Sequence, residues 1–125
     1  MIVDSSALVA ILRDEPEAEE FRELVAGNAT RVSAVTTLET AIVMTSARHH
    51  ELDHLLRDAE IGVVPFDAQH AELAREAYAR FGKHPGSKAK LNFGDCMTYA
   101  LAKATGEPLL FKGDDFTDTD ITPAR

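Results

Sequence analysis

The chain opens with Met1-Ile2-Val3-Asp4-Ser5-Ser6-Ala7-Leu8, and this stretch decides the fold. Ile2 and Val3 favour a short apolar strand. The apolar residues that follow recur at the spacing of a helix: Ala7, Leu8, Ile11 and Leu12. A strand therefore gives way to a helix at Asp4-Ser5, which makes this the first junction of an α/β fold.

Predicted strands and helices continue to alternate along the chain. Further strands are predicted at residues 31–35, 61–66 and 108–111. Further helices are predicted from Pro16 to Gly27 and at residues 36–48, 51–59, 68–81 and 92–104, and residues 82–87 are predicted to form a loop. This order predicts a parallel sheet with helices on both faces, and in such sheets functional sites form beyond the carboxyl ends of the strands.

Length and composition favour one folded domain over residues 1–125. Hydrophobic residues make up 45% of the chain and charged residues 27%, a balance that argues against disorder. No apolar run approaches the ~18 to 20 residues of a membrane span. Because the start lacks a secretion signal and the single Cys96 cannot form an internal disulfide, we expect a cytoplasmic protein.

Four acidic residues from distant segments are predicted to meet at one edge of the sheet: Asp4, Glu39, Asp95 and Asp114. Taken singly, each has a structural explanation as a helix cap or a turn residue. Taken together they would repel one another and destabilise the fold unless a divalent cation offset their charge. Oxygen donors without His or Cys favour Mg²⁺ or Mn²⁺ over Zn²⁺. Bound cations would also reduce the net charge of −8, which is otherwise unfavourable for binding phosphates.

Four stretches of the chain carry a family resemblance: Met1 to Leu8, Ser33 to Glu39, Leu91 to Cys96, and Leu110 to Phe116 with Thr119-Asp120. Together they resemble the PIN-domain ribonucleases and, within them, the VapC-like toxins of type II toxin-antitoxin systems. The resemblance covers essentially the whole chain. It implies a PIN-like three-layer α/β/α fold with a mostly parallel sheet of four to five strands.

The resemblance also implies an activity and a set of site residues. The activity is that of a Mg²⁺-dependent endoribonuclease that hydrolyses RNA phosphodiesters, with Mn²⁺ as a substitute ion. The implied catalytic and metal-binding residues are Asp4, Glu39, Asp95 and Asp114. Asp114 matches a variable fourth acid. Because Asp115 is its immediate neighbour, the choice between these two residues stays open. Ser6 matches a hydroxyl that supports the first acid.

Partners follow from the same resemblance: an RNA substrate, a cognate VapB-like antitoxin and a second copy of the chain in a homodimer, with no membrane. The most basic stretch of the sequence supplies Lys83, Lys88 and Lys90 as candidate RNA contacts. Lysines in a loop are more often simply solvated, so this assignment is an expectation of the nuclease hypothesis.

Three other functions are weighed against the nuclease. A phosphoacceptor signalling (receiver-like) domain needs an aspartate directly after the third strand and a lysine after the fifth. Here Asp67 begins a helix, and Lys112 precedes acids instead. A non-catalytic PIN-like binding module is disfavoured because acids stand at every matching position. A dehalogenase-type phosphatase needs Asp-x-Asp after the first strand, whereas Asp4 is followed by two serines.

Overall fold

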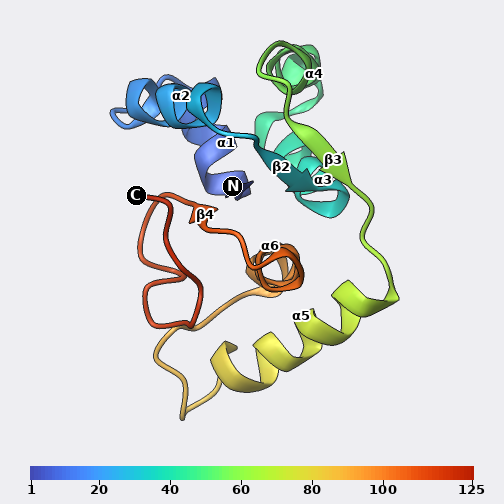
Figure 1. Cartoon of the computed structure of the whole chain (residues 1–125), viewed down its shortest axis with the longest axis vertical. Coiled ribbons are helices and arrows are strands. Elements are labelled where there is room, and N and C mark those ends of the chain that lie inside the picture. The colour runs from blue at the N-terminus through green and yellow to red at the C-terminus, as the bar shows by residue number, and fades with distance from the viewer.

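A computed structural model describes residues 1–125 and centres on a sheet with the strand order β3-β2-β1-β4 (Figure 1). The strands are β1 (Ile2–Val3), β2 (Arg31–Ser33), β3 (Gly62–Val64) and β4 (Leu109–Leu110). Every strand pair is parallel. The sheet therefore confirms the predicted α/β class and the predicted strand direction.

Helices connect the strands, with bounds close to those predicted. They are α1 (Ser5–Leu12), α2 (Ala18–Gly27), α3 (Ala34–Met44), α4 (His49–Asp58), α5 (Ala68–Phe81) and α6 (Phe93–Thr105), with a short 3₁₀ helix η1 (Ser46–Arg48). Asp67 caps α5 by accepting a hydrogen bond from His70 N at 2.9 Å. None of these helices has the length and apolar character needed to cross a membrane.

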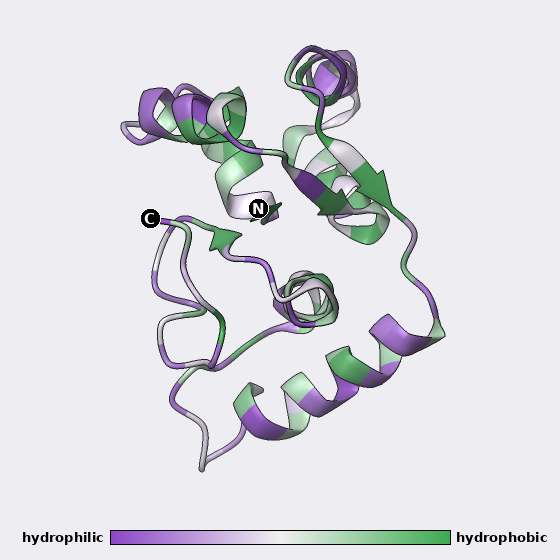
Figure 2. Cartoon of the chain, in the orientation of Figure 1, coloured by the Kyte–Doolittle hydropathy of each residue, from purple (hydrophilic) through white to green (hydrophobic).

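Apolar side chains from the two faces of the sheet build two separate cores. Ile2 and Leu109 are paired in register and lie in the core beneath α5 and α6. Val3 and Leu110 follow them and lie in the opposite core, which α1, α2 and α4 complete. This is the alternation that a pleated strand imposes, and it produces the helix–sheet–helix layers seen in Figure 1. In Figure 2, α2, α4 and α5 mix hydrophilic and hydrophobic residues, as expected of helices with one face in solvent.

The strand order places the carboxyl end of β1 at a special point of the sheet. From β1 the chain adds β2 and β3 on one side, and β4 then returns to the other side of β1. In open α/β sheets, ligands bind outside the carboxyl ends of the strands where the order reverses in this way. Asp4 is the first residue after β1 and therefore lies at this switch point.

The largest difference from the prediction lies around α3. The helix expected over residues 36–48 begins earlier, at Ala34, and ends at Met44. Thr45 follows with a positive φ of 67°, which breaks the helix before η1. Glu39 consequently lies in the second turn of α3, too far from the helix start at Ala34 to act as a cap.

The last residues of the chain run beside β4. Leu109 N donates to Thr122 O at 2.9 Å, and Ala124 N donates to Leu109 O at 2.8 Å. A parallel bridge joins Leu109 and Pro123. The outer side of β4 is thus hydrogen-bonded to the chain's own terminal segment.

Candidate active site

Asp4 is held by hydrogen bonds from two helices. It is the N-cap of α1, and its Oδ2 accepts from Ser6 N at 3.0 Å and from Ser6 Oγ at 2.6 Å. Its Oδ1 accepts from Thr98 Oγ1 of α6 at 2.7 Å. The side chain is almost fully buried, with 4% of its surface exposed. The orientation of this carboxylate is therefore fixed by the fold.

Glu39 reaches the same region from α3. Its carboxylate lies against Gly94, because a Cβ built on Gly94 would come within 1.8 Å of Glu39 Oε2. Burial raises the pKa of Glu39, a hydrogen bond from Ser5 partly offsets that shift, and the charge of Asp4 raises the pKa further. Glu39 and Asp4 thus act on each other electrostatically although they belong to different helix–strand units.

Asp95 lies in the first turn of α6 and takes part in a capping box. Its Oδ2 accepts from Asn92 N at 2.9 Å, and Asn92 Oδ1 accepts from Asp95 N at 2.8 Å. Burial raises the pKa of Asp95 to about 7 despite the hydrogen bond from Asn92, with further contributions from the charges of Asp4, Asp115 and Glu39. The capping explanation is therefore correct, yet the carboxylate also belongs to a cluster of acids that repel one another.

The segment after β4 carries the two candidates for a fourth acid, Asp114 and Asp115. Asp115 is the member of the Asp114–Asp115 pair whose charge acts on Asp95. Both side chains are exposed, and the carbonyl of Asp114 accepts from Thr117 N at 3.0 Å in a turn. The charge that raises the pKa of Asp95 is thus that of Asp115, whereas the resemblance matched Asp114 to the fourth acid.

No lysine, arginine or histidine forms an ion pair with Asp4, Glu39, Asp95 or Asp115. The nearest cation in sequence, Lys112, is paired instead with Glu15 at 2.5 Å and Glu17 at 3.0 Å. No three acidic, histidine or cysteine side chains lie close enough to form a finished set of metal ligands. The acids are coupled through their charges without forming a closed coordination shell, and their uncompensated oxygen donors fit a hard divalent cation.

Sequence reasoning missed two residues of this site. Thr98 follows Asp95 by three positions on α6, so the i, i+3 spacing that places two residues on one helix face was a usable signal. Gly94 lies inside a stretch that carried the family resemblance, but nothing in the sequence indicated that the side chain of Glu39 would occupy the space beside it. Ser6, by contrast, has the supporting contact with Asp4 that the resemblance implied.

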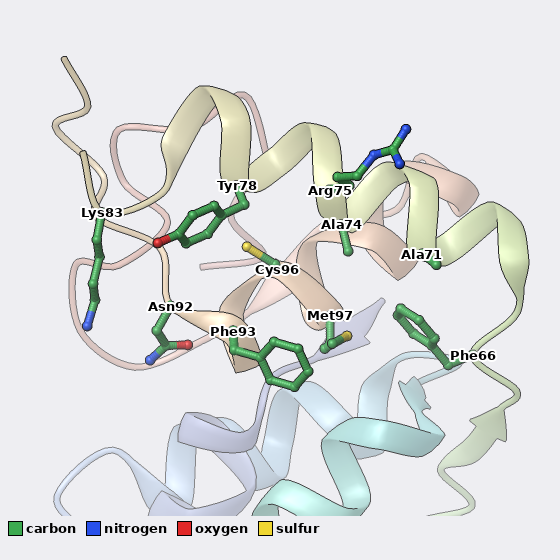
Figure 3. Close-up of a pocket in the computed structure, with 10 residues that line it drawn as sticks. All are labelled: Phe66, Ala71, Ala74, Arg75, Tyr78, Lys83, Asn92, Phe93, Cys96 and Met97. Atoms are coloured by element: carbon green, nitrogen blue, oxygen red, sulfur yellow. The ribbon is translucent and has the colours of Figure 1, made fainter. Parts of the chain in front are cut away.

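A cavity of about 590 Å³ lies between α5 and α6, next to the acids and not among them (Figure 3). Tyr78 of α5 and Phe93 of α6 line it, and 78% of the Phe93 surface is exposed. Lys83 lies at one end of this cavity. Lys88 and Lys90 are exposed in the neighbouring loop, and Lys90 Nζ donates to the carbonyl of His84 at 2.7 Å. Of the three candidate RNA contacts, Lys83 is therefore the one that lines this cavity.

Comparison with known proteins agrees with this geometry. The PIN domain family matches residues 1–121. Ribonuclease VapC28 of Mycobacterium tuberculosis is 47% identical over 129 residues, which cover 99% of this chain and 97% of that protein. A ribonuclease VapC of Mycolicibacterium smegmatis is 49% identical over 126 residues, covering 97% of each chain. The chain therefore belongs to the PIN-domain family and, within it, to the family of VapC ribonucleases.

Proposed function

We propose that this chain is a Mg²⁺-dependent endoribonuclease and the toxin of a VapBC-type toxin-antitoxin pair. The observation that carries the catalytic part is geometric: Asp4 is hydrogen-bonded to α6, Glu39 lies against Gly94 beside Asp95, and none of these acids is paired with a basic side chain. Burial and the charges of three other acids accordingly raise the pKa of Asp95 to about 7. Groups with such shifted pKa values concentrate at functional sites. The named activity of the relatives supports the same conclusion.

In the proposed mechanism, Asp4 and Asp95 would hold the metal ion, and Glu39 with Asp115 or Asp114 would complete the site or orient water. A bound dication supplies an activated water and offsets charge on the phosphate. The chain supplies orientation: Ser6 and Thr98 fix the two oxygens of Asp4, and Asn92 fixes one oxygen of Asp95. Lys112 stays paired with Glu15 and Glu17, which leaves the acidic charge available to the ion.

Metal dependence tests the proposal directly. We expect the purified chain to cleave RNA in Mg²⁺ or Mn²⁺ and to lose that activity in EDTA. Asp4→Asn should be inactive in either ion, because the amide can still cap α1 but cannot supply a full negative charge to the ion. Cleavage of labelled RNA on denaturing gels measures the effect. Equal cleavage with and without metal, or by Asp4→Asn, would contradict the mechanism, and RNA binding without cleavage would favour a non-catalytic PIN-like module.

Lys83 is proposed to contact the RNA backbone near the cavity. Lys83→Glu should raise the KM for RNA by roughly 3- to 10-fold with little change in kcat, because a lost phosphate contact weakens binding more than chemistry. The matched control is Arg57→Glu, the same charge reversal at an exposed residue of α4 on the other side of the sheet. If both variants shift KM equally, only the overall charge matters and Lys83 has no specific role.

The partner proposals rest on exposed apolar side chains. Leu38 and Ile42 of α3 and Phe93 of α6 are exposed over 61%, 70% and 78% of their surfaces. Large exposed apolar side chains mark interaction surfaces when they gather in one region. We propose that such surfaces serve a VapB-like antitoxin and a second copy of the chain, and that an antitoxin blocks the acids at Asp4, Glu39 and Asp95 with a basic side chain.

A further inference from the structure

We propose that Thr98 is a positioning residue for metal binding, and that Thr36 acts through it in a directed hydrogen-bond relay that ends on Asp4. The inference rests on the proposed function and adds a residue to it. Thr98 Oγ1 lies 2.7 Å from Asp4 Oδ1 and 3.2 Å from Thr36 Oγ1. Both threonines are 1% exposed, so their hydroxyls have no access to bulk water.

Proton counting gives the relay its direction. An ionised carboxylate only accepts hydrogen bonds, and a threonine hydroxyl has a single proton to donate. The proton of Thr98 is therefore used on Asp4, so the Thr98 oxygen must be the acceptor in its contact with Thr36. Thr36 in turn donates to Thr98. Hydrogen bonds in such a chain polarise and strengthen one another inside a protein.

Thr40 belongs to the same region but lies outside the relay. Its Oγ1 donates to the backbone carbonyl of Thr36 at 2.8 Å. Because that bond satisfies its only proton, Thr40 does not compete for the hydroxyl of Thr36. The relay thus contains Thr36, Thr98 and Asp4 and draws on α3, α6 and the end of β1.

The relay ties together the two acids proposed to bind metal most directly. Thr98 lies three residues after Asp95 on α6, so both side chains share one face of that helix. The bond from Thr98 to Asp4 consequently fixes Asp4 relative to the helix that carries Asp95. Ser6 alone could not do this, because it holds Asp4 Oδ2 from Asp4's own helix, α1. Outer residues that orient metal ligands typically contribute about 10- to 100-fold to metal affinity.

The test compares Thr98→Val with Thr98→Ser. Valine has nearly the shape of threonine but no donor, whereas serine keeps the donor. We expect Thr98→Val to bind Mn²⁺ about 10-fold more weakly in isothermal titration calorimetry and to lower kcat for RNA cleavage with little change in KM. Thr98→Ser should stay within about 3-fold of the unchanged chain in both measurements. If Thr98 had a purely structural role, its substitution would change thermal stability, and serine would not restore Mn²⁺ affinity and kcat.

Two further variants keep the inference falsifiable. Thr98→Ala gives the same comparison if Thr98→Val does not fold, because alanine suits a helix and adds no methyl group beside the carboxylate. Thr36→Val should weaken Mn²⁺ binding by about 2- to 5-fold. The double variant should bind Mn²⁺ no more weakly than Thr98→Val, because Thr98→Val has already broken the relay.

The outcomes separate the inference from the proposed function. If Asp4→Asn loses Mn²⁺ binding but Thr98→Val keeps the affinity of the unchanged chain, the role of Thr98 is overturned and the proposed function is not. Thr98→Ala replaces Thr98→Val in this comparison if the valine variant does not fold. Additive losses in the double variant would overturn the relay. Failure of the unchanged chain to bind Mn²⁺ and cleave RNA would overturn both the inference and the proposed function.

Discussion

Asp95→Asn is expected to reduce RNA cleavage by at least ~10³-fold while making the metal-free protein more stable at neutral pH. The loss of activity follows from the proposed role of Asp95, because a metal ligand would supply several kcal/mol of stabilisation to the transition state, and about 1.4 kcal/mol corresponds to tenfold in rate. The gain in stability follows because the charged carboxylate is buried among other acids. Asparagine keeps an oxygen that can accept from Asn92 N, so the capping box survives.

The raised pKa of Asp95 predicts the direction in which the stability of the metal-free protein changes with pH. The pKa of Asp95 is raised from 3.8 to about 7 in the folded chain, so the folded state binds the proton more tightly than the unfolded state does. The free energy of unfolding should therefore fall as pH rises from about 4 to about 7 and then level off. Solvent screening limits the fall to about 1 to 2 kcal/mol.

Chemical unfolding of the metal-free protein at pH 5 and pH 8 measures this fall. Asp95→Asn should show a smaller decrease between the two pH values than the unchanged chain. Asp118→Asn, at an exposed acid of the same segment as Asp115, is the control and should leave the decrease unaltered. If Asp95→Asn remains active, or if its stability depends on pH as that of the unchanged chain does, Asp95 does not belong to the cluster of interacting acids.

Gly94→Ala is expected to lower RNA cleavage by about 10- to 100-fold without unfolding the protein. A Cβ at this position would meet Glu39 Oε2 at 1.8 Å and Glu39 Cδ at 2.6 Å, so the carboxylate must move. Displacing a reacting or binding group by about 1 Å is sufficient for a loss of about 100-fold. The fold should tolerate the change, because Gly94 lies in α6, alanine favours helices and the obstructing atoms are the end of a flexible side chain.

Cleavage rates and thermal unfolding should be measured together for this variant. The matched control is Gly27→Ala at the end of α2, where an added Cβ meets nothing within 4 Å. We expect Gly94→Ala to stay within about 1 kcal/mol of the unchanged chain in unfolding free energy. A Gly94→Ala protein with full activity would show that the position of Glu39 is unimportant for catalysis.

Local patterns were sufficient to predict most elements of this fold. The α5 helix begins and ends at the residues that its spacing and the Asp67 cap predicted. The strands were located by short apolar runs, and β1 has the predicted residues, whereas β2, β3 and β4 are shorter than predicted. The break after Met44 was missed because it depends on a positive φ at Thr45, a conformation that threonine rarely adopts.

The candidate site was predictable only in part. Asp4, Glu39 and Asp95 could be proposed because each lies next to a strand or near the start of a helix, positions that topology brings to one edge. The Thr98 contact and the space beside Gly94 depend on how α3 and α6 lie against β1, which is a tertiary property. The choice between Asp114 and Asp115 depends on the path of a turn, so adjacent residues of the same type could not be separated by sequence.

The terminal segment beside β4 has a consequence for the solution behaviour of the chain. An edge strand with free backbone groups is a template for pairing with other molecules and so for aggregation. Thr122 and Ala124 occupy the outer hydrogen-bonding positions of Leu109, as a fifth strand would. These few residues thereby cover the β4 edge of the sheet. The β3 edge is the side on which a strand from another molecule could extend the sheet.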